Sequence, residues 1–122
     1  MIIRQTDSSA CEPVAMDGVE GVSMRVMLGR EDGAPNFAMR HFAVAPGGHT
    51  PHHSHDYEHQ LVILGGHGEA IDKGETRPIG KGDVLYVVAN EEHQFRNTGE
   101  EPLEFLCLVP LLGIIAAASS QY

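Results

Sequence analysis

Histidines crowd the middle of the chain, where four of the eight in the sequence fall between His52 and His59. Neutral imidazole is the commonest metal-binding side chain in proteins. Alternate side chains of an extended segment share a face, so those of His53 and His55 point to the same side. This spacing indicates a metal site, and the surrounding residues decide which kind.

One interpretation is a zinc peptidase, because His55-Asp-Tyr-Glu58-His59 matches the H-x-x-E-H motif. That chemistry needs a helix, so that both histidines face one way with the glutamate beside them. The glycines and proline just upstream, and the apolar run 61–64 that ends at a second glycine pair, favour a short buried strand instead. We therefore disfavour the peptidase and expect Glu58 to lie outside any catalytic site.

The other interpretation rests on two motifs that resemble those of the cupin family. The first family motif is glycine, five residues, H-x-H, three or four residues, glutamate, six residues, glycine. Here Gly47 precedes His53-Ser-His55, and then come His59 and Gly65. The departure is His59, which stands where most cupins have a carboxylate.

The second motif is glycine, five residues, P-x-G, two residues, histidine, three residues, asparagine. Residues 82–97 fit it from Gly82 through His93 to Asn97. Val88 replaces the proline and Asn90 the second glycine, and Asn tolerates the positive φ that a turn there needs. The resemblance covers about residues 24–110 and implies a jelly-roll fold.

More narrowly, the chain resembles small single-domain cupins whose metal is held by four histidines. The resemblance implies one divalent ion bound by His53, His55, His59 and His93. It implies manganese first and iron next, while imidazole also suits zinc, nickel and copper. Four neutral ligands leave the ion's double charge uncompensated, so we expect it to bind anionic or chelating substrates.

The elements that must position these side chains read as short strands separated by glycine turns. We expect strands over residues 23–28, 37–44, 60–64, 68–72, 84–88, 93–97 and 103–109, with an edge strand in the leader 1–22. No convincing helix is present. The pattern predicts an all-β sandwich or barrel of antiparallel strands, and the cupin jelly roll is one such fold. We expect one domain over residues 1–122, with the barrel at about 24–110.

Alternation along the strands suggests what the barrel interior contains. Glu104 should face water, which sends Phe105 and Cys107 inward. Arg40 shares a face with Phe42; if that face lines the barrel, Arg40 could bind an anionic part of a substrate, and otherwise it is a solvated strand residue. We therefore place Arg40, Phe105 and Cys107 in a candidate substrate pocket, although Cys107 also fits a small buried hydrophobe. The remaining histidines match no ligand position: His41, His49, His52 and His67.

Composition limits the partners. A formal net charge of −9 disfavours nucleic acid and anionic membranes. We expect no signal peptide, because residues 1–7 lack its long apolar stretch, and no run reaches the ~20 apolar residues that a membrane span needs. Two cysteines, Cys11 and Cys107, make no disulfide framework and fit free thiols in a cytoplasmic protein. The apolar tail 111–122 favours a homodimer, because such a tail would otherwise be an exposed patch.

Three functions fit this sequence. The first is a metal-dependent oxygenase acting on a small organic molecule. The second is a non-redox cupin isomerase or lyase, in which the metal polarises a substrate oxygen. The third is a barrel that binds a small molecule without turnover. A lyase or isomerase needs a general base, and the assigned inward faces offer no spare carboxylate, so we favour the oxygenase.

Overall fold

The computed structural model describes residues 1–111. The apolar tail for which we expect a partner subunit lies, apart from Leu111, outside the described residues. Within residues 1–111 no helix is long and apolar enough to cross a membrane.

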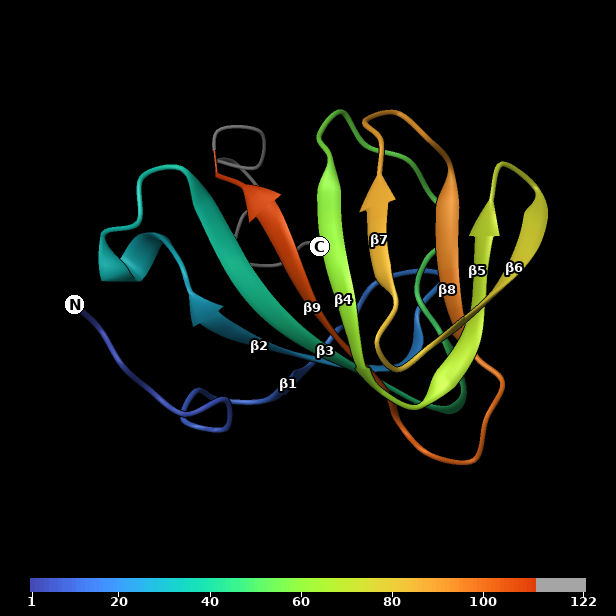
Figure 1. Cartoon of the computed structure of the whole chain (residues 1–122), viewed down its shortest axis with the longest axis horizontal. Helices are drawn as coiled ribbons and strands as arrows, with labels where there is room; N and C mark the ends of the chain where they lie inside the picture. Colours follow the sequence, from blue (N-terminus) through green and yellow to red (C-terminus); the bar gives the residue numbers. More distant parts are fainter. Residues whose placement is uncertain (112–122) are drawn as a thin grey trace.

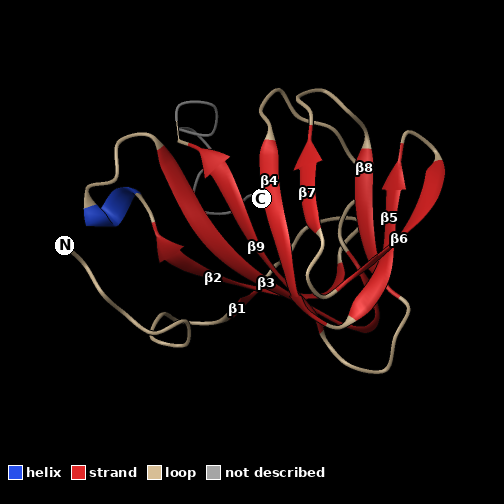
Figure 2. Ribbon diagram, viewed as in Figure 1, coloured by secondary structure: helices blue, strands red, loops and turns tan. Residues whose placement is uncertain are grey.

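Nearly all regular structure in the described chain is β-strand, as predicted (Figure 2). A single 3-10 turn, η1 (Arg30–Asp32), interrupts the strands, and residues 1–111 contain no α-helix. The strands are β1 (Glu12–Pro13), β2 (Glu20–Leu28), β3 (Phe37–His49), β4 (His59–Gly65), β5 (His67–Asp72), β6 (Glu75–Gly80), β7 (Val84–Val87), β8 (His93–Asn97) and β9 (Leu103–Pro110).

The strands join in one antiparallel sheet that curls into a half-barrel (Figure 1). Its order is β6-β5-β8-β3-β9-β4-β7, and β2 also pairs with β3. The path starts at β6 and ends at β7, which follow each other in the chain across residues 81–83 but do not pair. The curled sheet therefore has an open seam between β6 and β7.

The core lies inside the curl, and the predicted alternation is confirmed there. On β9 the inward side chains, Leu103, Phe105, Cys107 and Val109, are all buried. The Phe105 ring stacks on Phe42 of β3 with their centroids 5.2 Å apart. Burying such a side chain contributes about 1.5–3 kcal/mol, so this cluster stabilises the wall on which the site is built.

The predicted strands differ from the structure in two places. β6 was missed, because its residues are mostly polar and exposed and include Pro78, which argues against a strand. β3 continues past the predicted end at Val44 to His49, since its glycines let it bend without ending. A Cβ on Gly48 would lie 2.5 Å from the carbonyl oxygen of Glu20 on β2, so only glycine permits this close approach. The turn at Asn90 has the expected positive φ, 67°.

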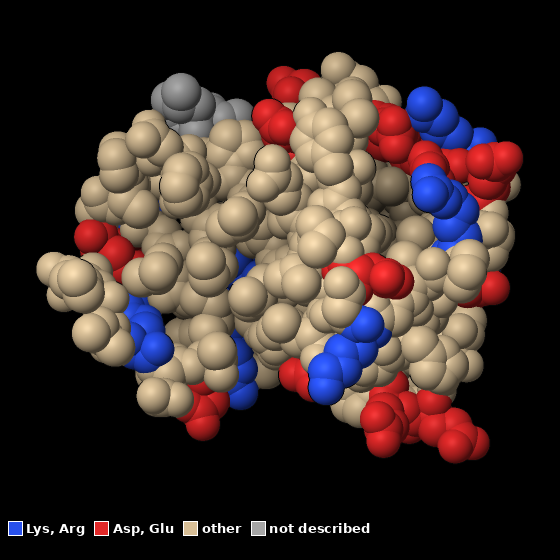
Figure 3. Space-filling view, viewed as in Figure 1, with Lys and Arg blue, Asp and Glu red and all other residues tan. Residues whose placement is uncertain are grey.

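The outward face of β3, β4 and β7 exposes large apolar side chains. Figure 3 shows few charged side chains over β9, β4 and β7 in this view. We call this surface the outer apolar face and define it by five exposed residues: Phe37, Leu64, Val84, Tyr86 and Val88.

Candidate metal centre

Four histidines from three parts of the chain meet inside the curl. His53 and His55 lie in the loop between β3 and β4, His59 is the first residue of β4, and His93 is the first residue of β8. The loop is tied to β8 through a bridge between His53 and His93. The backbone amide of His53 donates to the His93 carbonyl at 3.1 Å, and that of His93 donates back at 2.9 Å.

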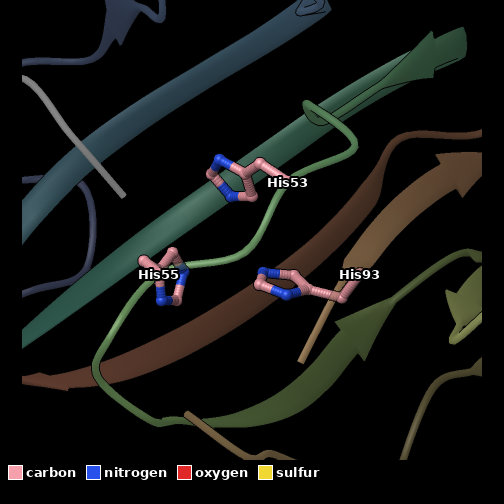
Figure 4. Close-up of side chains that lie close together, drawn as sticks. All are labelled: His53, His55 and His93. Atoms are coloured by element: carbon pink, nitrogen blue, oxygen red, sulfur yellow. The ribbon is translucent and has the colours of Figure 1, made fainter. Parts of the chain in front are cut away.

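Three of these rings form a compact group (Figure 4). One ring nitrogen from each of His53, His55 and His93 lies within 4.8 Å of the other two, close enough to hold one metal ion. The ring centroids are 5.1 Å apart for His53 and His55, and 5.0 Å apart for His55 and His93.

His59 adjoins this group. Its Nε2 lies 2.5 Å from Nε2 of His55, and its ring centroid is 5.5 Å from that of His93. At that distance the two nitrogens cannot both carry a proton, so at least one of the two imidazoles presents a lone pair to the other. The structure thus brings all four predicted ligands together, with three in the tight group and His59 against His55.

Hydrogen bonds at the opposite ring nitrogen orient two of the rings. Nδ1 of His55 contacts the carbonyl oxygen of Tyr57 at 2.9 Å, and Nδ1 of His93 contacts that of Glu91 at 2.8 Å. A carbonyl only accepts, so each Nδ1 carries the proton and each Nε2 keeps its lone pair. Metal-binding histidines are commonly held in this way. Among residues 1–111, no hydrogen-bond partner reaches the buried Nε2 of His93.

Burial keeps these imidazoles neutral. It lowers the pKa of His59 to about 2 and that of His53 to about 4, and repulsion from neighbouring histidines adds to the effect. Burial also lowers the pKa of His55 and His93, although their bonds to backbone carbonyls act in the opposite direction. Neutral imidazole is the form that ligates, so the donor set fits a divalent transition metal.

No carboxylate is found among the buried polar side chains of residues 1–111. These are Arg40, Thr50, His59, His93 and Asn97. His59 occupies the position at which the motif usually has a glutamate, and the structure supplies no other buried acid in its place. A metal ion here would therefore keep most of its positive charge.

The candidate pocket residues line the same interior, next to His59. The Cys107 Sγ lies 2.9 Å from Nδ1 of His59 and 3.7 Å from a guanidinium nitrogen of Arg40. Arg40 is 2% exposed, and its guanidinium carbon lies 5.2 Å from the ring centroid of Phe42. Burial raises the pKa of the Cys107 thiol, while Arg40 acts to lower it. The face of Arg40 thus lines the barrel.

Sequence reasoning missed Tyr57. Its ring stacks on His55, with centroids 4.0 Å apart and planes 6° apart. Nothing in the spacing of the motif marks this residue, because the loop path alone places it there. Burial raises the pKa of its hydroxyl, so it stays protonated at neutral pH.

The sequence also did not reveal a cavity of about 360 Å³ at the open seam. His93 lines it together with Phe95, and its carboxylates include Asp72, Asp83 and Glu91. These acids lie on or beside strands, and the sequence does not predict which strands pair. Their approach to His93 was therefore not predictable.

The other four histidines lie outside the cluster. Nε2 of His41 is 3.2 Å from Glu104, and Nε2 of His52 is 3.1 Å from Glu92. His49 contacts the carbonyl of Thr50, and His67 is exposed on β5. The pairing of His52 with Glu92 agrees with the prediction that it matches no ligand position.

A family model described as a cupin domain matches residues 40–109. Among curated proteins, the chain is 34% identical over 117 residues to an oxalate-binding protein of Thermotoga maritima, covering 92% of this chain and 95% of that protein. It is 35% identical over 71 residues to 1-methylthio-D-xylulose 5-phosphate methylsulfurylase of Rhodospirillum rubrum, covering 58% and 46%. The chain spans about half the length of the second relative and nearly all of the first.

Solved structures agree on the fold. The polyketide cyclase RemF from Streptomyces resistomycificus superposes with a TM-score of 0.85 at 28% identity, covering 90% of this chain and 79% of that one. A predicted oxalate decarboxylase from Thermotoga maritima gives a TM-score of 0.81 at 28% identity, covering 89% and 98%. The names of these proteins point to different substrates on one architecture.

Proposed function

The chain belongs to the cupin family, and on that premise we propose that it is a metal-dependent oxygenase acting on a small organic molecule. The observation behind this proposal is the meeting of four neutral imidazoles in an interior where the described residues place no buried carboxylate. When bound, a divalent ion would supply Lewis acidity toward a substrate oxygen, and manganese or iron would add redox chemistry.

We propose that His53, His55, His59 and His93 hold one ion, with manganese first and iron next. The orientation of His55 and His93 by backbone carbonyls supports this set. The short approach of His59 to His55 supports His59 as the fourth member. Zinc, nickel and copper suit imidazole as well, and intrinsic affinity favours these late metals.

Arg40, Phe105 and Cys107 form the proposed inner wall of the substrate pocket. Arg40 is a buried cation, and the Cys107 side chain lies between its guanidinium and the His59 ring. A guanidinium in such a place can bind an anionic oxygen with charge-assisted hydrogen bonds. This arrangement supports a substrate head that carries an acidic or enolic oxygen.

A non-redox isomerase, lyase or cyclase is the second candidate, and one observation favours it. Glu91 and Asp72 line the cavity that His93 also lines, so a carboxylate base is available near the site, though not in its buried part. RemF, which has this fold, is named a polyketide cyclase. Under this second candidate, Glu91→Gln should abolish turnover, whereas under the oxygenase it should not.

An assay in two atmospheres separates these functions. Manganese- and iron-loaded protein is mixed with oxalate, 1,3-diketones and phenols, and turnover is followed with an oxygen electrode and again in a sealed anaerobic cell. The oxygenase predicts oxygen uptake that is abolished under anaerobic conditions and in His93→Ala. Equal turnover in both atmospheres supports the second candidate, and no turnover in either supports a binding protein.

We also propose that two copies associate through the outer apolar face. Its exposed residues, with Val84 80% exposed, form the kind of patch that marks an interaction site. With a net charge of −9, two copies repel each other, so they approach at least cost where charged side chains are few. One exposed and one buried free thiol, Cys11 and Cys107, fit our proposed cytoplasmic location.

A further inference from the structure

We propose that the seam cavity between β6 and β7 holds a neutral, ring-sized apolar part of the substrate. The substrate class is then a molecule with a chelating oxygen head and an apolar body, as opposed to a small dianion such as oxalate. This inference rests on the proposed function, because the histidine cluster must bind the head.

The cavity has the size and the walls for such a body. Its volume of about 360 Å³ lies within the range of small-molecule sites, roughly 300–1,000 Å³. Part of its lining is apolar and comes from four strands, where the following side chains are at least nine-tenths buried: Ala70, Ile71, Ile79, Val87 and Phe95. This part of the lining favours an apolar group and offers a charged one no partner.

The cavity and the histidine cluster meet at His93. This residue belongs to the cluster and also lines the cavity. Phe95, two residues further along β8, has its ring centroid 5.9 Å from that of His93. A ligand whose oxygen head lies at the histidines can therefore extend its body along β8, over Phe95, toward the seam.

Charges around the mouth disfavour an anionic body. Arg77 bonds Asp72 at 2.9 Å, and Lys73 lies 3.5 Å from Glu91, so both cations already face carboxylates. Asp83 adds a third carboxylate to the lining, and it accepts a hydrogen bond from the amide of Gly80 at 2.8 Å. Three acids against two bases leave this region negative, which disfavours an anionic body.

Two diketones that share one head isolate the contribution of the body. Binding of acetylacetone and benzoylacetone to manganese-loaded protein is measured by calorimetry, with oxalate as a third ligand. The metal content of the protein is measured afterwards, to exclude removal of the manganese by the chelating ligands. Burying the phenyl ring should make benzoylacetone bind about tenfold tighter than acetylacetone. Oxalate, which has no apolar group beyond its chelating oxygens, should bind no tighter than acetylacetone.

A variant that narrows the cavity should remove this preference. Ala70→Leu on β5 should weaken benzoylacetone about tenfold, toward the affinity of acetylacetone, and leave acetylacetone unchanged. Thr76→Leu is the matched control, since Thr76 is exposed on the neighbouring strand and outside the cavity. If Ala70→Leu does not fold, Ile79→Phe narrows the same cavity from β6.

The outcomes separate the inference from the function on which it rests. Equal affinity for the two diketones, or a preference that survives narrowing of the cavity, would overturn the inference while the metal site stands. Failure of both diketones and of oxalate to bind metal-loaded protein would instead refute the proposed recognition of a chelating head. A benzoylacetone preference that Ala70→Leu removes and Thr76→Leu keeps supports the seam site.

Discussion

His53 and His93 exchange two backbone hydrogen bonds, although 40 positions separate them in the chain. This bridge joins the loop of the first motif to the first residue of β8 in the second motif. Because backbone atoms make the bridge, replacing either imidazole should leave it in place. Side-chain variants at these positions therefore test ligand chemistry with little disturbance of the fold.

The contact between His59 and Cys107 predicts a role for the thiol in orienting a ligand. For His59 to present Nε2 to a metal, its Nδ1 must carry the proton and donate to Sγ, 2.9 Å away. Cys107→Ala should weaken manganese binding about tenfold, measured by competition with a chromophoric chelator, and Cys107→Ser should restore most of it. Cys11→Ala is the control on an exposed cysteine. If all three variants bind manganese as tightly as the unmodified protein, this role is contradicted.

The lowered pKa values predict how the stability of the metal-free protein depends on pH. The folded protein keeps His53 and His59 neutral down to about pH 4 and about pH 2, whereas in the unfolded chain both bind protons near pH 6.5. The unfolded state thus binds more protons, so stability is fully present above about pH 6.5 and falls progressively below it. Urea midpoints from pH 7.5 to 4.5 measure this fall.

Replacing these two imidazoles provides the control. A His53→Gln and His59→Gln double variant should show a smaller decline in urea midpoint between pH 7.5 and 4.5 than the unmodified protein. An identical decline in both proteins would mean that other groups cause it.

Glu58 should not matter for metal binding or turnover. It is exposed and bonds to the hydroxyl of Tyr86, which raises the pKa of that tyrosine. Glu58→Gln should leave metal content unchanged and move the alkaline absorbance transition of one tyrosine to lower pH. Loss of a peptide-hydrolysing activity in this variant would revive the zinc-peptidase interpretation.

Association through the outer apolar face predicts a species of about twice 13.2 kDa in sedimentation velocity. Val84→Lys places a charge on that face and should shift the protein to the monomer, because an unpaired buried charge is costly. Thr76→Lys changes charge equally on exposed β6 and should leave the dimer intact. A monomeric unmodified protein, or a dimer that survives Val84→Lys, would contradict this interface.

The sequence predicted the parts of the fold that follow from local patterning. The strand over 103–109 and its inward alternation are seen in β9, because Glu104 marks the outer face and the residues of opposite parity are all apolar. The turn at Asn90 was predictable, since few residues other than glycine accept its φ of 67°. The prediction that the four histidines lie together depended on finding both cupin-like motifs in the family's order along the chain.

What the sequence did not predict depends on contacts between distant segments. β6 is polar and contains a proline, so it is a strand only because β5 pairs with it. The seam cavity follows from the failure of β6 and β7 to pair, which no local pattern signals. The stacking of Tyr57 on His55 depends on the path of a loop without regular structure.

Metal stoichiometry across six proteins tests the central proposal most directly. Untagged protein, the four single alanine variants of the cluster histidines and His52→Ala are loaded with manganese, dialysed and analysed by mass spectrometry of the metal. We predict one ion per chain in the unmodified protein and in His52→Ala, whose exposed ring faces Glu92. We predict a sharp loss in His53→Ala, His55→Ala, His59→Ala and His93→Ala. Full metal content in His59→Ala would contradict the four-histidine site, and equal loss in His52→Ala would contradict the assignment of ligands.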